Sequence, residues 1–388
     1  MDCPTRPTLE NQAAPAVSAP AVSAYLDFAR RAARARVPVS GDIEITRRCN
    51  FDCIHCYLGR EKSRAARISG ELQTQQWKDI IDEIVAAGCL FLLFTGGEPL
   101  LRKDFPDLYA HAKKRGLIVT VFTNGSLVDE SIIDVFHEYP PNCVEVSLYG
   151  ATEATYAAIT RRPGMLEKSR NGLGLLVDAG IRTRMKTVLL TKNRHEFDAV
   201  RRLADDYGLK FRFDGMIFPC LDGDRGPTAF RISPEEVAEK NLAVSRLTNE
   251  WRALAERMKQ VPFSDVLYDC GAGTNNFHID PFGWLKPCLM INDIRYDLVK
   301  GSFRDGWENR IPNIREKKIP LEFECKTCEN RAYCGYCPAF FRLDTGSETT
   351  VSEYLCRIGR CMADRLNVDE MVIGDGHVRK ERSEKATL

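Results

Sequence analysis

The sequence predicts an α/β protein made of repeated strand–helix units and followed by a cysteine-rich region. From Gly41 to about residue 220, short β-branched or apolar runs alternate with helical stretches about every 30 residues. A glycine stands just past each of four expected helices, where a C-cap glycine belongs: Gly88, Gly116, Gly180 and Gly208. Of the 15 cysteines, three fall within residues 49–56 and eight within residues 270–361.

Six strands and five helices are expected in the repeating part. The strands are Asp42–Thr46, Leu90–Thr95, Ile118–Phe122, Cys143–Leu148, Thr183–Leu190 and Lys210–Phe218. The helices between them are Thr74–Ala87, Phe105–Arg115, Glu130–Glu138, Met165–Ala179 and Glu196–Tyr207. Parallel strands joined by right-handed crossovers form either an open doubly wound sheet or a barrel that can be incomplete, and the periodicity fits both.

The segments outside these units differ in character. Residues 1 to about 22 are rich in Ala, Pro and Ser without periodicity, so we expect disorder there, followed by a short basic helix over Tyr25–Arg36. After residue 220, a Gly/Asp/Pro-rich loop and one long helix over Pro234–Lys259 form a connector. The rest, to about residue 361, has too few apolar runs to form a core unaided, so bound metal is expected to stabilise it.

The composition excludes several classes of protein. The 388 residues are 44% hydrophobic and 28% charged, which suffices for large buried cores. A formal net charge of +1 provides no general attraction for nucleic acid or an anionic membrane. Apolar runs such as Cys89–Phe94 are far shorter than the roughly 18 residues of a spanning helix, and the first residues do not form a signal peptide. We therefore expect a cytoplasmic protein without nucleic acid or membrane partners.

An odd number of cysteines without a signal peptide argues against a disulfide framework. In a reducing compartment, clustered cysteines are more often metal ligands or redox groups. Four cysteines stand alone: Cys3, Cys89, Cys143 and Cys220. Cys89 and Cys143 begin strands and Cys220 ends one, so we expect all three to be buried as small hydrophobic residues.

Cys49, Cys53 and Cys56 form a C-x3-C-x2-C pattern directly after the first strand. Three thiolates in one short loop can hold a four-iron cluster and leave one iron open to a non-protein ligand. Zinc is the alternative, but His55 stands between two of the cysteines, which hinders its use as a fourth tetrahedral ligand. The loop follows the carboxyl end of a strand, where α/β folds bind their ligands.

A second motif, Gly96, Gly97, Glu98 and Pro99, ends the second strand. Two adjacent glycines let the backbone approach a ligand closely and expose amide and carbonyl groups to it. The same four residues alone would also suit a tight turn before a helix. The cysteine loop one strand–helix unit upstream favours the binding role.

The cysteine loop resembles the cluster loop of the radical S-adenosylmethionine (AdoMet) enzymes. In that family an aromatic residue precedes the third cysteine; here His55 takes its place and Tyr57 follows as a further candidate for cofactor binding. The resemblance implies a partial (β/α)6 barrel, with a 4Fe–4S cluster on the three cysteines. It also implies AdoMet bound by its amino group at the Gly-Gly-Glu-Pro segment, and a low-potential electron donor such as flavodoxin or ferredoxin.

Other candidate residues stand at the ends of the later strands. Asn124 and Ser147 resemble residues that line the AdoMet pocket of the family, although Asn-Gly is also an ordinary turn. Arg184 and Lys186 share one face of the fifth strand and could bind the AdoMet carboxylate or form a solvated face. Asp214 on the sixth strand could act as a base or pair with a neighbouring arginine.

The cysteine-rich region resembles the SPASM domain, which holds two auxiliary 4Fe–4S clusters. Its eight cysteines are Cys270, Cys288, Cys325, Cys328, Cys334, Cys337, Cys356 and Cys361. The family pattern is followed except that two residues, instead of three, separate Cys334 from Cys337. The resemblance implies a first auxiliary cluster on Cys270, Cys288 and Cys337, and a second on Cys325, Cys328, Cys334 and Cys356. Cys361 either completes the first cluster or is a spare thiol that leaves an iron open to substrate.

Two further points concern the same region. A zinc ribbon built from its two C-x2-C pairs is the alternative to the clusters. Asp280 lies in an Asp-Pro-Phe-Gly segment and is expected to form a turn.

The resemblance divides the chain into functional parts and implies a reaction class. The parts are residues 1–24, a leader; 25–220, the AdoMet barrel; 221–262, a connector; 263–365, a SPASM domain; and 366–388, a charged tail. AdoMet would be cleaved to a 5′-deoxyadenosyl radical that removes hydrogen from a substrate, which the auxiliary clusters help to oxidise. The first substrate hypothesis is a ribosomally made precursor peptide, with a separate recognition protein because little chain precedes Gly41.

Two alternatives remain. One is oxidation or epimerisation of a small molecule such as a sugar or cyclitol, which would need a closed pocket where a peptide needs an open groove. The other is a zinc-stabilised binding module without catalysis.

Overall fold

The computed structural model describes residues 19–59, 70–243, 245–259 and 263–366. Its parallel strands are β1 Ser40–Thr46, β2 Phe91–Gly96, β3 Ile118–Thr123, β4 Cys143–Ser147, β5 Thr183–Val188 and β6 Lys210–Asp214. The connecting helices are α2 Thr74–Ala86, α3 Phe105–Lys114, α4 Glu130–Glu138, α5 Glu153–Thr160, α6 Met165–Asp178 and α7 Phe197–Asp206.

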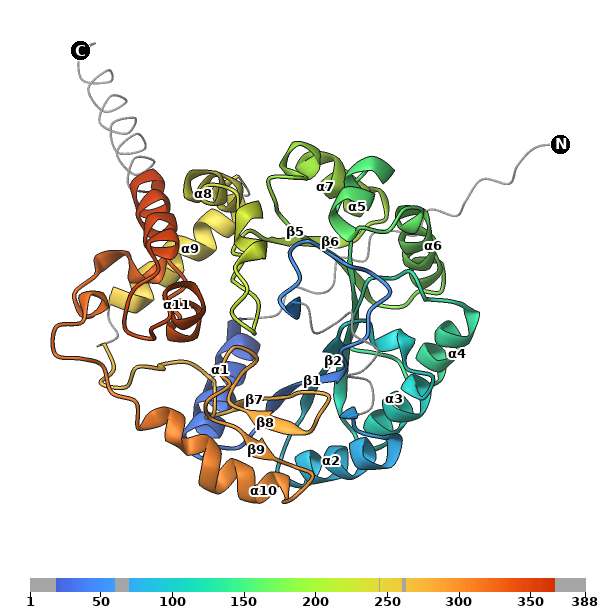
Figure 1. Ribbon diagram of the computed structural model, residues 1–388, viewed down its shortest axis with the longest axis horizontal. Helices are drawn as coiled ribbons and strands as arrows, with labels where there is room; N and C mark the ends of the chain where they lie inside the picture. Colours follow the sequence, from blue (N-terminus) through green and yellow to red (C-terminus); the bar gives the residue numbers. More distant parts are fainter. Residues whose placement is uncertain (1–18, 60–69, 244, 260–262, 367–388) are drawn as a thin grey trace, which may run out of the picture.

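The six strands lie side by side in chain order, each parallel to the next. Figure 1 shows the strands as a curved row with α2 to α7 on its outside. This is the expected partial barrel of strand–helix units. The glycines after four of the helices have positive φ angles, 99° at Gly88, 85° at Gly116, 67° at Gly180 and 67° at Gly208, as C-cap glycines should.

Two strands end earlier than expected. β5 ends at Val188 and β6 at Asp214. The Asp214 carboxylate accepts a hydrogen bond from the Met216 amide (2.9 Å), which turns the chain out of the sheet. Pro219, which has no N–H group to donate to a neighbouring strand, also disfavours continuation of β6. Helix α5 was not anticipated from the sequence.

The cysteine-rich region continues the sheet of the barrel. β7 Asn276–Ile279 pairs parallel with β1, and β8 Trp284–Lys286 and β9 Tyr296–Asp297 follow it antiparallel, so nine strands form one sheet. The Phe277 ring lies over Gly41, where an added Cβ would come within 2.1 Å of it. Glycine at position 41 therefore lets β7 pack closely on β1.

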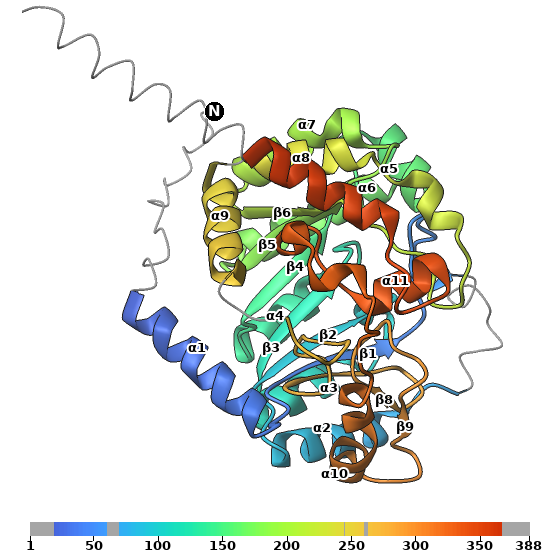
Figure 2. The same cartoon turned by 90° about the vertical axis from the view of Figure 1, so that its left-hand side faces the viewer.

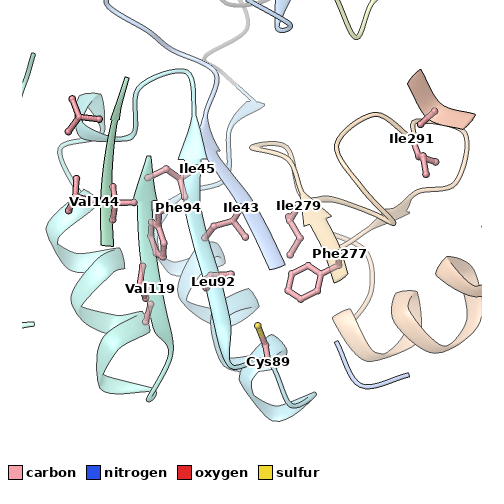
Figure 3. Packing of buried hydrophobic residues seen from close by; sticks show 14 of the residues in the cluster. Ile43, Ile45, Cys89, Leu92, Phe94, Val119, Val144, Phe277, Ile279 and Ile291 are labelled. Atoms are coloured by element: carbon pink, nitrogen blue, oxygen red, sulfur yellow. The ribbon is translucent and has the colours of Figure 1, made fainter. Parts of the chain in front are cut away.

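The buried core also runs through both parts of the chain. Figure 3 shows Phe277 and Ile279 of β7 on one side of Ile43 of β1, with Phe94 of β2 on its other side. The region was expected to form no core unaided, and its buried apolar side chains indeed belong to the same core as those of the barrel.

The region also reaches the other edge of the barrel. The region ends in α11 Pro338–Thr345 and a final helix, residues 353–366, and Figure 2 shows this final helix running past α8. The Tyr354 hydroxyl donates to the Gly215 carbonyl (3.1 Å), just beyond β6. The cysteine-rich region thus spans the open side of the barrel, from β1 to β6.

Two expectations about the flanking segments need correction. Helix α1 covers Ala19–Arg34, so it begins within the expected leader. The connector holds two helices, α8 Pro234–Leu242 and α9 Ser245–Lys259, in place of one. They pack against each other. The expectations for residues 1–18 and 367–388, including Cys3, lie outside the described residues.

Within the part of the chain that the structure describes, no helix combines the length and apolar character needed to cross a membrane.

Candidate active site

The loop that carries Cys49, Cys53 and Cys56 is held by helix α5. The Asp52 amide donates to the Thr160 carbonyl (2.9 Å) and the Ile54 amide to the Ile159 carbonyl (3.0 Å). These bonds fix the loop backbone between the cysteines. The unanticipated helix therefore positions the loop.

The three cysteines line a cavity of about 420 Å³ at the carboxyl ends of the parallel strands. Ten of the residues singled out from the sequence lie in its wall: Cys49, Cys53, Cys56, Tyr57, Gly96, Gly97, Asn124, Ser147, Lys186 and Asp214. Glu98, Pro99 and Arg184 lie outside it. Strand ends far apart in the sequence therefore converge on one site, as parallel topology requires.

Gly96 and Gly97 let the cysteine loop pass close to β2. A Cβ at Gly96 would lie 2.3 Å from the Thr46 carbonyl oxygen, and one at Gly97 would lie 2.2 Å from the Arg48 carbonyl oxygen. Gly96 also has a φ of 132°, which favours glycine. The Gly97 amide donates to the Thr46 carbonyl (2.8 Å). The glycine pair thus brings the cysteine loop and the end of β2 into one wall of the cavity.

Glu98 supports that wall from behind. Its fully buried carboxylate accepts hydrogen bonds from the Thr123 hydroxyl (2.8 Å), the Asn124 amide (2.7 Å) and the Leu100 amide (3.1 Å). Burial raises the pKa of Glu98 to about 7. Pro99 is buried at the start of a short 3-10 helix. Both residues stand next to the cavity and join β2 to β3.

Asn124 connects β3 to the cysteine loop. Its side-chain amide donates to the Asn50 side chain (2.8 Å), and its oxygen accepts from the Ser126 amide (2.9 Å). The Asn50 amide in turn donates to the Ser126 hydroxyl (2.8 Å). Asn50, between the first two cysteines, was not singled out from the sequence.

The two aromatic positions around the third cysteine are also held by partners. The His55 ring packs edge-on against Tyr149, with 4.7 Å between ring centroids. The Tyr57 hydroxyl donates to the buried Glu44 carboxylate on β1 (2.9 Å). His55 therefore makes an aromatic contact next to the third cysteine.

A charged group forms another part of the cavity wall. The Lys186 ammonium lies 3.1 Å from a Glu145 carboxylate oxygen and 3.3 Å from the Phe122 ring centroid. The Arg212 guanidinium donates to the same carboxylate (2.8 Å). Burial lowers the pKa of Lys186 to about 8, against the opposing effect of Glu145. Burial likewise raises the pKa of Asp214, which opens on the same cavity.

Arg184 and Lys186 do share one face of β5, as predicted. Arg184 pairs in register with Glu145, and Lys186 pairs with Ser147, one step nearer the carboxyl end. Only Lys186 therefore reaches the cavity. Glu145 and Phe122 were missed in the sequence, although a carboxylate within the apolar run Cys-Val-Glu-Val-Ser is a signal that a charged partner lies opposite.

Two more cavity residues come from β1 and β7. Asp42 on β1 pairs in register with His278 on β7, and both line the cavity. The His278 ring is 1% exposed and lies 3.9 Å from Glu44. Burial, with the nearby Lys286 and Arg47 charges, holds the pKa of His278 well below its usual range. The sequence could not reveal this pair, because it depends on β7 joining β1.

A second cavity, of about 280 Å³, is lined by Cys270, Cys288 and Cys337. Asp42 lines this cavity as well as the first. The two cavities therefore share a wall on β1.

Four other cysteines lie close together, namely Cys325, Cys328, Cys334 and Cys356. Burial, with the neighbouring charges of Cys334, Cys356 and Cys328, raises the pKa of Cys325 to about 12. Cys361 is elsewhere, with its sulfur 3.9 Å from a Glu235 carboxylate oxygen of α8. The clustered cysteines thus form three groups, one at each of the two cavities and one of four, and Cys361 lies apart from all of them.

The single cysteines and Asp280 behave as expected. Cys89, Cys143 and Cys220 are buried, and the Cys220 thiol donates to the Cys56 carbonyl (3.4 Å). The Asp280 carboxylate accepts from two amides of its own turn, those of Phe282 (3.0 Å) and Trp284 (3.1 Å).

The chemistry of the cysteine groups fits iron–sulfur clusters, because each group offers several thiols around one space. A cubane separates its thiolate ligands more widely than one ion does, so cysteines around a cavity fit it. The first cavity has such a group at one end and a glycine-lined wall beside it, which fits a four-iron cluster with an organic ligand.

The cysteine loop, the glycine-lined wall and the partial barrel are together the features of a radical AdoMet enzyme. The chain belongs to the radical SAM superfamily, whose model it matches over residues 43–204. It is therefore an enzyme of the class that binds AdoMet and a 4Fe–4S cluster.

Individual relatives differ in what they make. The chain is 30% identical to the mycofactocin maturase MftC of Mycobacterium tuberculosis, over 78% of each protein. It is 25% identical to an AdoMet-dependent heme synthase of Methanosarcina barkeri, over 78% of this chain and 92% of the relative. Among solved structures it is similar to Streptococcus suis SuiB bound to its precursor peptide SuiA, with 16% identity, a TM-score of 0.65, and 86% and 81% of the two chains covered.

Proposed function

We propose that this enzyme oxidises a side chain of a ribosomally made peptide, as a maturase. The observation that carries this proposal is the shared wall of the two cavities at Asp42. A substrate held in the first cavity would lie next to the cysteines of the second. Such proximity suits a reaction in which the substrate loses an electron after losing a hydrogen atom.

Three groups of residues would hold the cofactors. Cys49, Cys53 and Cys56 would hold the cluster that binds AdoMet. Cys270, Cys288 and Cys337 would hold the first auxiliary cluster, and the second would lie on Cys325, Cys328, Cys334 and Cys356. When bound, AdoMet and its cluster supply the 5′-deoxyadenosyl radical that removes a hydrogen atom from the substrate, and the auxiliary clusters supply an acceptor for the electron then released.

The remaining cavity residues would bind and orient. Gly96 and Gly97 would present backbone groups to the AdoMet amino group, with Glu98 and Pro99 fixing that segment. Ser147 would contact the ribose or carboxylate of AdoMet. Lys186 would supply the positive charge for a carboxylate.

Asp214 would take the proton that the substrate loses on oxidation. It opens on the cavity at the end of β6, and burial raises its pKa toward the range useful for a base.

The size of the first cavity favours a side chain over a large ring. Its volume of about 420 Å³ is near the lower end of the range for a site that holds one ligand of drug size. With AdoMet bound, the remaining room suits one peptide side chain. The mycofactocin maturase likeness supports the same choice. The enzyme would still need an electron donor such as flavodoxin or ferredoxin to reduce the cluster that binds AdoMet, and a recognition protein for a short peptide.

A second candidate is a step in the synthesis of heme. The heme synthase of Methanosarcina barkeri is matched over 92% of its length, more than the maturase is. A porphyrin substrate would have to lie at the mouth of the first cavity, with one of its substituents inside the cavity.

The two candidates are separated by supplying each substrate to the anaerobically reconstituted enzyme with AdoMet and dithionite. We expect about twelve irons per chain, and a peptide encoded beside the gene to lose two hydrogen atoms as 5′-deoxyadenosine forms. A change in an iron–porphyrin carboxylate, with the peptide unchanged, would establish the second candidate instead. Cys53→Ala should abolish 5′-deoxyadenosine formation, whereas the buried Cys89→Ala should retain it.

A further inference from the structure

Asp42 is placed where the barrel meets the cysteine-rich region. It pairs in register with His278 of β7, and it lines both the first cavity and the cavity of Cys270, Cys288 and Cys337. The residue is partly buried. Among the residues that the structure describes, none forms a hydrogen bond or an ion pair with its carboxylate.

A carboxylate removed from water requires compensation. Burial of an ionised carboxylate without a partner is costly, so such groups are paired or coordinate a metal. The other buried carboxylates nearby are paired: Glu44 accepts from Tyr57, and Glu145 accepts from Arg212. Asp42 differs from both, and it faces a cavity with three thiols.

That group of three thiols is one ligand short for a four-iron cluster. Cys361 does not complete it, because its sulfur contacts Glu235 on α8 and it lies on the final helix, residues 353–366. The cavity lining contains no further cysteine, within the described residues. The fourth ligand has to be a different side chain or a molecule from outside.

The other polar side chains around this cavity are committed or exposed. The Tyr268 hydroxyl donates to Glu348 (3.0 Å), and the Tyr336 hydroxyl donates to the Leu267 carbonyl (2.8 Å). Asp269 is exposed to solvent, and its charge acts on Arg315. Asp42 is the partly buried acidic side chain at this cavity whose carboxylate has no hydrogen-bond or ion-pair partner among the described residues.

On the basis of the auxiliary cluster in the proposed function, we propose that the Asp42 carboxylate is its fourth protein ligand, together with Cys270, Cys288 and Cys337. The barrel strand that borders the substrate thus ligates the cluster directly. Replacement of a thiolate by a less electron-donating ligand raises the potential of an iron–sulfur centre, as in Rieske centres. An oxygen ligand therefore makes this cluster the better electron acceptor.

The test uses the full chain with Cys49→Ala, Cys53→Ala and Cys56→Ala, so that only the auxiliary clusters contribute signals. This parent should hold about eight irons. Asp42→Cys and Asp42→Ala are compared with Asp269→Ala. This control variant removes an exposed carboxylate that lines the same cavity. The measurements are iron content, the midpoint potentials, the electron paramagnetic resonance of the reduced clusters, and electron–nuclear double resonance after addition of ¹³C-cyanide.

We expect Asp42→Cys to keep the iron content and to lower one of the two midpoint potentials, because the unique iron gains a thiolate. Asp42→Ala should open that iron to cyanide, so that a ¹³C coupling appears that the parent and Asp269→Ala lack. If Asp42→Ala loses the cluster, restoration of the iron content by Asp42→Cys supports ligation. Failure of Asp42→Cys to restore it overturns the inference.

Both Asp42 variants could instead have the same resonance spectra and midpoint potentials as the parent. That result would also overturn the assignment of Asp42 as a cluster ligand, and it would leave the proposed auxiliary clusters intact. A parent with about four irons or fewer would instead refute the two-cluster part of the proposed function. The two failures are therefore distinguishable.

Discussion

At the scale of single residues, the cavity places opposite charges where the sequence showed only isolated candidates. Lys186 is held between the Glu145 carboxylate and the face of Phe122. The carboxylate favours the charged ammonium, whereas burial disfavours it, and burial prevails, so the pKa falls to about 8. The charge of Lys186 can therefore change near neutral pH, which ordinary lysines do not do.

This shift predicts how AdoMet binding depends on pH. If Lys186 binds the AdoMet carboxylate, the affinity should fall by about tenfold or more as the pH rises through 8, because the ammonium loses its proton. Lys186→Arg should remove this fall, since arginine stays charged, and Lys186→Met should bind weakly throughout. Anaerobic calorimetry between pH 7 and 9.5 measures the effect. The same fall in Lys186→Arg would show that another group is responsible.

At the scale of elements, the pairing of β7 with β1 joins the two parts of the chain. Gly41 and Phe277 face each other in register, and the ring occupies the space of the missing side chain. The pairing brings His278 to the first cavity and places Asp42 beside the second. One close contact between strands therefore determines which residues the cavities share.

Gly41→Ala tests this contact. The new methyl group would collide with the Phe277 ring, and such overpacking costs about 1–3 kcal/mol, so the melting temperature should fall. Gly174→Ala, on α6, is the control, because an added Cβ there meets no atom within 4 Å and alanine favours a helix by about 1 kcal/mol. Hydrogen exchange should also increase in β7 of the Gly41 variant alone. Equal melting temperatures for both variants would contradict this role of Gly41.

At the scale of the whole molecule, the cysteine-rich region spans the gap between β1 and β6. It reaches the first edge through β7 and the second through Tyr354. Its segment around residues 320–337 is different, because the described structure there consists of short 3-10 helices, Glu324–Lys326 and Glu329–Ala332, without a strand. That segment depends most on the clusters for its order.

Removal of iron should therefore loosen the molecule unevenly. After chelation, limited proteolysis should first cut within residues 320–337, while β7 to β9 stay protected by the common sheet and core. Mass spectrometry of the fragments locates the cuts, and the reconstituted protein digested in parallel is the control. A first cut within β7 to β9 would mean that the sheet itself needs the clusters.

The sequence by itself determined the strand–helix repeat, the positions of the C-cap glycines and the place of the cysteine loop. These features depend on local preferences and short spacings, which act within a few residues of the chain. Ten of the candidate site residues line the cavity because parallel strands bring their carboxyl ends together, and the strands themselves could be predicted from the sequence. Cys361 was left open between two roles, and the structure places its sulfur 3.9 Å from a Glu235 carboxylate oxygen.

Only the tertiary structure decided how the cysteine-rich region meets the barrel. No local pattern in the sequence indicates that β7 pairs with β1, because the paired residues are more than two hundred positions apart. The backbone hydrogen bonds that join the two strands can also be formed by any sequence. The packing of Phe277 on Gly41 selects it. From that pairing follow the buried His278, the wall common to both cavities, and the position of Asp42 between them.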